Sequence, residues 1–308
     1  MNVLIMLAHN RLTGVNTWAY TLSKELSSRG YSVDVEIDDG NKQELMFVDG
    51  YNKFTDKIKK VSNNIFIRKH ADHSKYDIVI SSYNFHDLDG STKYIYVIHG
   101  IGLRIFEPPK SENIYKVSVS DISHKHYKTD KLIYNGVDLD EFNFTSGPSK
   151  VPRSVLYLSR YYLPYEIYYA CETMNIKIHQ SKWDEDIVNK IHDADFVITH
   201  GRGAYESMAC GRPVFVYSSF ARDFEGRTLC DGWVKKENFK KLLTKNCSGW
   251  VNRHHMKNID DFKKAFAVYD SDDGGVNRQL AEKYLSSKIF GDKYEEVFNE
   301  LGVAKSGK

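Results

Sequence analysis

The stretch that decides the fold is Asp195–Ser218, which reads DFVITHGRGAYESMACGRPVFVYS. Its pattern predicts five pieces in order: a buried strand at 195–199, a glycine loop at 200–203, a short helix at 204–210, a stop at Gly211 and a second strand from Pro213. A strand that leads through glycines into a helix start is typical of an anion-binding turn, because backbone amides and the helix dipole both favour negative charge there.

Three residues of this turn are candidates for ligand contacts. Gly201 and Gly203 carry no side chains, so backbone N–H groups could approach a phosphate closely. Glu206 lies in the first turn of the expected helix, where its carboxylate could accept hydrogen bonds from ribose or sugar hydroxyls. The alternative is a plain strand–turn–helix without a ligand, because short glycine motifs are common in α/β proteins.

Composition indicates a soluble globular protein. The chain has 308 residues, 41% hydrophobic and 27% charged, which suits two domains of ordinary size. The net charge of +2 gives no overall attraction to nucleic acid or membrane. The four cysteines lack metal-binding spacing and indicate reduced thiols of a cytoplasmic protein. The apolar run at 3–8 is too short for a signal peptide or a transmembrane segment.

The amino-terminal half begins with a strand, a loop, a helix and a second strand, expected at 3–7, 9–14, 15–29 and 31–37. This order is typical of a Rossmann-like domain, although the loop holds Gly14 alone and no G-x-G-x-x-G. Short strands are also expected at 76–81 and 94–98. His99 and Gly100 directly follow the second of these, at the end of a parallel strand where such sheets bind ligands.

Two motifs resemble those of GT-B glycosyltransferases, especially the retaining group that includes glycogen and sucrose synthases. Glu206-Ser-Met-Ala-Cys-Gly-Arg-Pro-Val214 is similar to the second half of the family's donor-binding segment E-G-F-G-x-x-x-x-E-A-M-A-C-G-x-P-V. Asn135-Gly-Val-Asp-Leu-Asp-Glu-Phe142 is similar to its N-G-V-D-x-x-x-F. The resemblance implies an α/β protein of the GT-B class, with two Rossmann-like domains whose parallel sheets face each other across a cleft.

The expected domains are an acceptor domain over 1–150, a nucleotide-sugar donor domain over 151–285 and a final helix within 286–308 that packs back on the first domain. The resemblance covers residues 1–214, and it also implies which residues bind the donor. Arg160 matches the arginine of the family's diphosphate-binding G-R-x-x-x-x-K, and the implied donor-binding set is Arg160, His200, Gly201, Arg202, Gly203 and Glu206.

The resemblance further implies that His99 is catalytic, close to the transferred sugar or to the acceptor hydroxyl. Candidates for the cleft or the acceptor side are His9, Gly14 and Gly100. Two residues of the family pattern are missing. Ile198 stands where the first glutamate is expected, and Tyr165 stands where the lysine is expected.

The implied function is that of a glycosyltransferase that moves a hexose from a nucleotide-sugar donor, such as UDP-glucose, to an acceptor hydroxyl. The resemblance implies retention of configuration, no metal and no tightly bound cofactor. Alternatives left open are a phage-type glucosyltransferase acting on modified DNA bases, a sugar-nucleotide 2-epimerase and a non-catalytic sugar-nucleotide-binding protein. The acceptor could be a DNA base, a glycan or a lipid, and the oligomeric state is left open.

Overall fold

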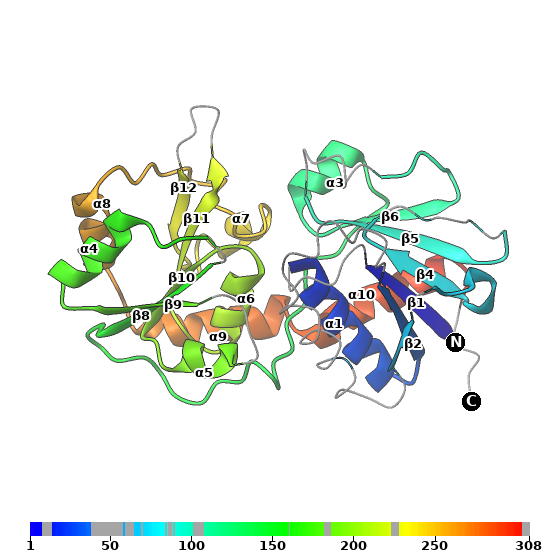
Figure 1. The fold of residues 1–308 in the computed structure, drawn as a ribbon, viewed down its shortest axis with the longest axis horizontal. Helices are drawn as coiled ribbons and strands as arrows, with labels where there is room; N and C mark the ends of the chain where they lie inside the picture. The colour runs from blue at the N-terminus through cyan, green and yellow to red at the C-terminus, as the bar shows by residue number, and fades with distance from the viewer. Residues whose placement is uncertain are drawn as a thin grey trace. The chain divides into compact units, whose positions relative to one another are not determined.

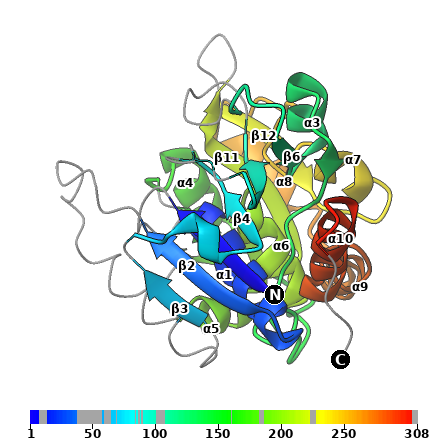
Figure 2. The same ribbon diagram turned by 90° about the vertical axis from the view of Figure 1, so that its right-hand side faces the viewer.

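The computed structural model describes residues 1–7, 14–37, 58, 65–68, 70–83, 85, 88, 90–100, 108–159, 161–181, 186–222 and 228–303. The chain divides into two compact units. Unit 1 consists of Met1–Gly136 with Ser287–Lys308, and unit 2 consists of Val137–Ser286. In each unit the described strands form one sheet with helices packed against it (Figures 1 and 2).

The described elements of unit 1 are β1 (Asn2–Leu7), α1 (Gly14–Ser28), β2 (Ser32–Ile37), β3 (Ile65–Arg68), the 3-10 helix η2 (His73–Lys75), β4 (Ile78–Ser81), β5 (Lys93–Ile98), β6 (Ile114–Ser118), α3 (Asp121–Tyr127), β7 (Lys131–Leu132) and α10 (Ser287–Glu300). The strand order is β3-β2-β1-β4-β5-β6-β7, and neighbouring strands are parallel. The order reverses between β1 and β4, as it does in a Rossmann sheet, which binds ligands beyond the carboxyl ends of its strands.

The alternation of side chains along β1 explains its unbroken apolar sequence. Val3 and Ile5 face the core shared with α1 and α10, while Leu4 and Met6 face a second core on the other side of the sheet. A strand covered on both faces needs apolar side chains at every position. The predicted central strand is therefore confirmed.

Helix α10 packs against α1 and closes one face of the unit 1 sheet. Tyr294 and Phe298 are buried in the same core as Trp18. At the edge of this contact the Arg29 guanidinium lies 2.8 Å from a carboxylate oxygen of Asp292, and it also pairs with Glu295. Helix α10 thus completes the unit that the first residues begin.

The described elements of unit 2 are β8 (Ser154–Leu158), α4 (Tyr165–Thr173), β9 (Lys177–Ser181), α5 (Ile187–His192), β10 (Phe196–Thr199), α6 (Arg202–Ala209), β11 (Val214–Arg222), β12 (Thr228–Trp233), α7 (Phe239–Leu243), α8 (Ile259–Phe266) and α9 (Asp272–Tyr284). The strand order is β12-β11-β10-β8-β9. Helices α4 and α8 pack on one face over an aromatic core, and α6 packs on α9, β10 and β11.

The second sheet is mixed, whereas the sequence predicted a parallel one. Strand β12 runs antiparallel to β11, and the other neighbouring strands are parallel. Only five residues separate the end of β11 at Arg222 from the start of β12 at Thr228. A parallel neighbour needs a crossover of about a dozen residues or more, so this short connection requires an antiparallel edge strand.

The chain passes between the units at 136–137 and again at 286–287. The first passage lies in the N-G-V-D motif, where Asp138 Oδ1 accepts hydrogen bonds from the amides of Asp140 at 3.0 Å and Glu141 at 3.2 Å. The Val137 amide donates to the Leu285 carbonyl at 2.6 Å. The two segments at which the chain passes between the units are therefore hydrogen-bonded to each other.

The division at 136–137 precedes the domain boundary expected near residue 150. Residues 137–150 are grouped with unit 2. Part of the reason is Asp195, at the start of β10, whose carboxylate accepts hydrogen bonds from the amides of Ser149, Arg153 and Ser154. Within the ranges given above, the structure contains no helix of the length and apolarity that a membrane crossing requires.

Candidate functional site

The predicted glycine loop lies at the switch point of the unit 2 sheet. Strand β8 pairs with β9 on one side and with β10 on the other, so the chain order reverses between β8 and β10. The Thr199 hydroxyl donates to the Leu158 carbonyl at 2.9 Å and ties the carboxyl ends of these strands together. Sheets of this kind bind ligands in the crevice beyond such ends.

Gly201 has a backbone conformation that favours glycine. Its φ is 60° and its ψ is −133°, a region that side chains with a Cβ avoid. Its amide donates to the Cys247 carbonyl at 2.8 Å. The N–H group that the sequence assigned to a phosphate is therefore bound to the protein, and the role of Gly201 in this structure is to turn the chain from β10 into α6.

Gly203 is required by close packing. A Cβ at this position would lie 2.5 Å from Thr199 Oγ1 and 3.3 Å from Leu158 Cδ2. The missing side chain lets α6 lie directly against the ends of β10 and β8. The Gly203 amide belongs to the first turn of α6, whose N–H groups have no backbone acceptor within the helix. N–H groups in this position are the ones that bind anions at helix starts.

Arg202 and Glu206, two predicted donor-binding residues, form a buried ion pair. Arg202 Nε lies 2.8 Å from Glu206 Oε1, and the two side chains are 8% and 1% exposed. They stand one helical turn apart, at positions i and i+4 of α6, which places them on the same face. His200 is half-buried between β10 and Gly201. The structure thus brings His200, Gly201, Arg202, Gly203 and Glu206 into one loop and helix start.

The turn that follows α7 supports this loop, and sequence reasoning missed it. Asn246 and Cys247 have φ values of 55° and 46°. The Cys247 carbonyl holds the Gly201 amide, and the Tyr205 hydroxyl donates to Asn246 Oδ1 at 2.9 Å. The residues Asn246, Ser248 and Gly249 indicate a turn, but nothing in their order predicts that it packs against the glycine loop.

Asp195 anchors the start of β10 in unit 2. It is 7% exposed, and its carboxylate accepts three backbone amides at 2.8–2.9 Å. Burial alone would raise the pKa of Asp195, but the amides of Arg153, Ser149 and Ser154 stabilise its charged form and hold the pKa below its usual value. Asp195 is therefore a charged anchor that positions the strand leading to the loop.

Arg212 closes the other end of the motif. Its guanidinium donates to the carbonyls of Ile191 at 3.1 Å, His192 at 2.7 Å and Ser146 at 2.6 Å, and the residue is 1% exposed. Burial lowers the pKa of Arg212. The side chain caps the last turn of α5, whose final carbonyls have no partner inside that helix.

Gly211 and Cys210, which end the motif's helix, have structural roles. Gly211 has a φ of 71°, which confirms the predicted stop after α6. All four cysteines of the sequence are buried free thiols. Burial raises the pKa of Cys210 to about 12, so this thiol is protonated and unreactive at neutral pH.

Of the predicted residues of unit 1, His99 and Gly100 lie at the carboxyl end of a strand. His99 directly follows β5, is half-buried, and packs edge-on against the ring of Trp18 with 5.0 Å between ring centroids. Gly100 follows it. Gly14 is the first residue of α1, and an added Cβ there would meet open space among the described residues that are not its neighbours in the chain. His9 and Arg160 lie outside the described residues.

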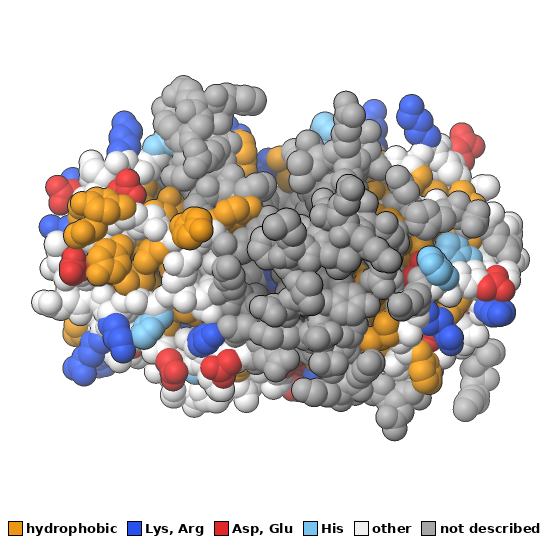
Figure 3. Space-filling model, in the orientation of Figure 1, with side chains coloured by type: hydrophobic (Ala, Val, Ile, Leu, Met, Phe, Trp, Pro, Cys, Tyr) orange, Lys and Arg blue, Asp and Glu red, His pale blue; other side chains and the backbone are white. Residues whose placement is uncertain are grey.

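Tyr165 occupies the position where the family pattern has lysine. It is the first residue of α4 and is 62% exposed, and Tyr162 close by is 94% exposed. Hydrophobic side chains gather at the surface over α4 (Figure 3). A phenol ring at this position supplies no positive charge, so a diphosphate would need its cations from other residues.

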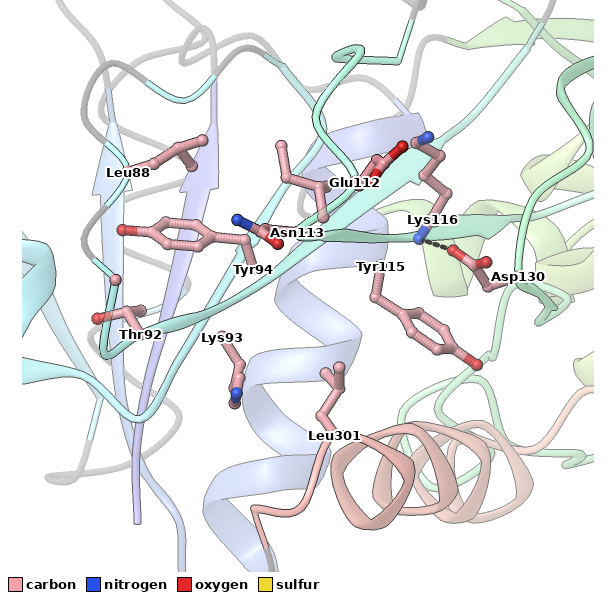
Figure 4. Close-up of a pocket in the computed structure, with 12 residues that line it drawn as sticks. Leu88, Thr92, Lys93, Tyr94, Glu112, Asn113, Tyr115, Lys116, Asp130 and Leu301 are labelled. Atoms are coloured by element: carbon pink, nitrogen blue, oxygen red, sulfur yellow. Dashed lines mark hydrogen bonds between the residues drawn. The ribbon is translucent and has the colours of Figure 1, made fainter.

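A cavity of about 630 Å³ opens elsewhere in unit 1 (Figure 4). Thr92, Lys93 and Ile114 line it at the amino ends of β5 and β6, and Leu301 closes it from the end of the chain. This is the opposite end of the strands from His99. The cavity contains none of the predicted site residues, so it lies apart from the site that the sequence predicted.

No protein-family model matches the sequence, and no curated protein sequence matches it. Similar solved structures include Anabaena HepE in complex with UDP and glucose, with 12% identity and a TM-score of 0.57 over 97% of this chain and 100% of that one. A glycosyltransferase from Rickettsia africae has 15% identity and a TM-score of 0.59 over 99% of both chains. Sucrose-phosphate synthase from Thermosynechococcus elongatus has 12% identity and a TM-score of 0.56, covering 98% of this chain and 99% of that one.

At these identities the likeness concerns the fold, and it extends over nearly the whole of each chain. The sheet topology of each unit agrees with it. The fold predicted from the sequence is confirmed: this protein has the GT-B fold of the glycosyltransferases to which it is similar.

Proposed function

We propose that this protein is a glycosyltransferase that binds a nucleotide-sugar donor at the glycine loop of unit 2 and transfers its sugar to an acceptor hydroxyl. The observation that carries the proposal is the loop itself. It lies at the switch point between β8 and β10, it turns at Gly201, and it leads into a helix that starts with Arg202 and Gly203. Support comes from HepE, a protein of similar fold that was crystallised with UDP-glucose.

The donor diphosphate is assigned to the amino-terminal end of α6. The amides of the first turn and the helix dipole both favour an anion there. Arg202 supplies a guanidinium, whose planar fork matches phosphate oxygens, and Arg160 and His200 complete the polar set. From unit 1, we propose that His99 contacts the transferred sugar or the acceptor hydroxyl. His9, Gly14 and Gly100 are assigned to the cleft or the acceptor side.

The proposed reaction moves a hexose, with UDP-glucose as the first donor to test, and it retains the configuration of the sugar without a metal ion. The leaving diphosphate gains negative charge as the glycosidic bond breaks. Positive groups and dipoles already in place near that charge stabilise the transition state more than they stabilise the ground state. The Arg202 side chain and the start of α6 are the described groups suited to this task.

A thermal-shift panel of UDP-, GDP-, ADP- and CDP-sugars tests the proposal. A ligand that binds only the folded protein raises its stability by about 2.7 kcal/mol at a concentration of 100 times Kd. We expect the melting temperature to rise with at least one donor, and to rise less in Gly203→Ala, whose added Cβ disturbs the helix start. If no nucleotide sugar or nucleoside diphosphate raises the melting temperature, the proposal is wrong.

Turnover assays with the donor identified in this way separate the related functions. Transfer to a glycan, lipid or modified-DNA acceptor identifies the acceptor class, and the anomeric configuration of the product by NMR shows whether the reaction retains it. Conversion of the donor with no acceptor present indicates a 2-epimerase. Tight binding without turnover on any acceptor indicates a binding protein. Activity that is lost on treatment with EDTA contradicts the metal-independent mechanism.

A further inference from the structure

The buried pair Arg202–Glu206 is difficult to explain by stability alone. Both side chains are more than nine-tenths buried, and their charged atoms lie 2.8 Å apart. Removing two charges from water is costly, and well-packed apolar residues of the same volume often give equal or greater stability. A pair of this kind at the start of a helix beside a glycine loop therefore needs another reason for its presence.

The geometry of the pair fixes the direction of the arginine. Glu206 Oε1 binds Nε, the nitrogen nearest the aliphatic part of the side chain. Because the guanidinium is planar, a bond at Nε determines where NH1 and NH2 point. A fork that is already oriented loses less conformational entropy when it binds a phosphate. The Glu206 carboxylate makes the site less positive, which by itself would weaken the binding of a phosphate. What it contributes to phosphate binding is therefore the orientation of the Arg202 guanidinium.

The sequence around the pair favours a role for such an arginine. Tyr165 replaces the lysine of the family pattern and is exposed, and Ile198 replaces the first glutamate inside a buried strand. A nucleoside diphosphate carries more than one negative charge, and a cation close to the first turn of α6 would neutralise part of that charge. Arg202, which directly follows Gly201, stands at that place.

We infer that Glu206 is a positioning residue, which acts on the donor through Arg202, and that the guanidinium of Arg202 binds the donor diphosphate. Glu206 then makes no direct contact with ribose, contrary to what the sequence resemblance implies. The inference rests on the proposed function, since it assigns roles within the same donor site. The two assignments predict different losses when Glu206 is changed. A positioning role weakens binding of the diphosphate, whereas a ribose contact weakens binding of the ribose.

Isothermal titration calorimetry with three ligands tests this difference. The ligands are the nucleoside diphosphate that the wild type binds most tightly among UDP, GDP, ADP and CDP, its 2′,3′-dideoxy form, and inorganic pyrophosphate. We expect Glu206→Gln to weaken all three by a similar factor, of the order of tenfold. If Glu206 binds ribose, the variant weakens the ordinary nucleotide alone, and the inference is overturned.

A double-mutant cycle gives a second readout. In an Arg202→Met background we expect Glu206→Gln to cause no further loss of affinity, because the group through which it acts is absent. A loss that persists in this background overturns the inference. Asp273→Asn serves as the control, since it removes the carboxylate of the ion pair with Lys235 in the same unit, and its affinities should equal those of the wild type.

Arg202→Lys covers the case in which Glu206→Gln does not fold. It keeps a positive charge beside Glu206 but loses the planar fork, so we expect weaker binding of both pyrophosphate and nucleotide. Binding at wild-type affinity shows that the guanidinium is not a diphosphate ligand and contradicts the inference. A wild-type protein that binds none of the nucleotides contradicts the proposed function itself, which distinguishes the two failures.

Discussion

At the residue scale, the two glycines of the loop meet different physical demands. Gly201 has a positive φ, while its absent Cβ would have room, with the nearest side-chain atom 3.7 Å away at Asn246 Nδ2. Gly203 has no positive φ, but its absent Cβ would overlap Thr199 Oγ1. The first glycine is required by backbone conformation and the second by packing.

This difference predicts different responses to alanine. Gly201→Ala should lower the free energy of unfolding by about 1–3 kcal/mol through backbone strain. Gly203→Ala should lower it by about 1–3 kcal/mol through overpacking. Urea unfolding measures both.

A second substitution separates the two causes. Thr199→Ala removes the oxygen that a Cβ at position 203 would meet, so the loss caused by Gly203→Ala should be smaller in that background. The loss caused by Gly201→Ala should be unchanged there. Equal losses for Gly203→Ala in both backgrounds would show that Thr199 is not the obstacle.

Asp195 predicts a pH dependence of stability. Its folded-state pKa lies below 3.8, the ordinary value of an aspartate, so its contribution is fully present above that pH and is lost as the pH falls through the folded-state pKa. Asp195→Asn should lower the free energy of unfolding by about 1.5–3 kcal/mol at pH 7, the usual contribution of hydrogen bonds to a charged group.

Urea unfolding at pH 7, 5 and 3 checks this prediction. The difference between wild type and Asp195→Asn should be the same at pH 7 and 5 and smaller at pH 3. Asp193→Asn is the control, because Asp193 is an exposed aspartate two positions earlier in the chain. A difference that grows toward pH 3 would contradict a charged Asp195 in the folded protein.

At the scale of elements, the ends of α5 and α6 depend on arginines from other parts of unit 2. Arg212 holds the carbonyls of Ile191 and His192 at the end of α5, and Arg278 of α9 holds the Ala209 carbonyl at the end of α6. These bonds fix the helices that flank the glycine loop.

Arg212→Lys should destabilise the protein by about 2 kcal/mol or more, because each buried acceptor that loses its partner costs about 1–3 kcal/mol. The ammonium group of lysine cannot reach three carbonyls in the geometry of the guanidinium fork. Thermal unfolding of the variant measures the loss. Arg153→Lys is the matched control, since Arg153 is exposed, and its melting temperature should stay at the wild-type value.

The elements also show what the sequence could predict. The strand of 3–7, the helix that follows it and the strand–loop–helix of 195–210 were predictable because apolar runs, helical spacing and glycines are local signals. The α4 helix was missed, since its sequence YEIYYACET is rich in aromatic residues that are typical of strands and starts after Pro164.

The supporting contacts of the site lay beyond such reasoning because they join distant residues. Asp195 binds amides more than 40 positions earlier in the chain, and Cys247 binds Gly201 more than 40 positions later. The ion pair between Arg202 and Glu206 was within reach, because residues four apart on a helix are neighbours. The candidate residues were therefore named from local patterns and from the family resemblance, while their actual partners required the fold.

At the scale of the whole molecule, the two units should respond separately to core substitutions. Phe298 of α10 is 1% exposed and packs on Tyr31 in the core of unit 1. Phe298→Ala should destabilise that unit by about 3–5 kcal/mol, the usual effect of removing a buried phenylalanine. Hydrogen exchange should then rise in β1, β5 and β6 and stay unchanged in β8 and β10.

Phe262→Ala is the reciprocal variant. Phe262 is 1% exposed and packs on Phe266 in the core of unit 2. Its loss should raise exchange in β8, β10 and β11 and leave β1 and β5 protected. If either variant raises exchange equally in all of these strands, the molecule unfolds as a single cooperative body.

The position of α10 has a consequence for synthesis on the ribosome. Residues 1–136 emerge before residues 137–286, but the helix that covers one face of their sheet, α10, is made only after both. Residues 137–286 form a continuous unit and are complete before that helix appears. Unit 2 can therefore reach its native state before unit 1, whose apolar face with Val3 and Trp18 stays uncovered, and open to chaperones, until residues 287–300 have been made.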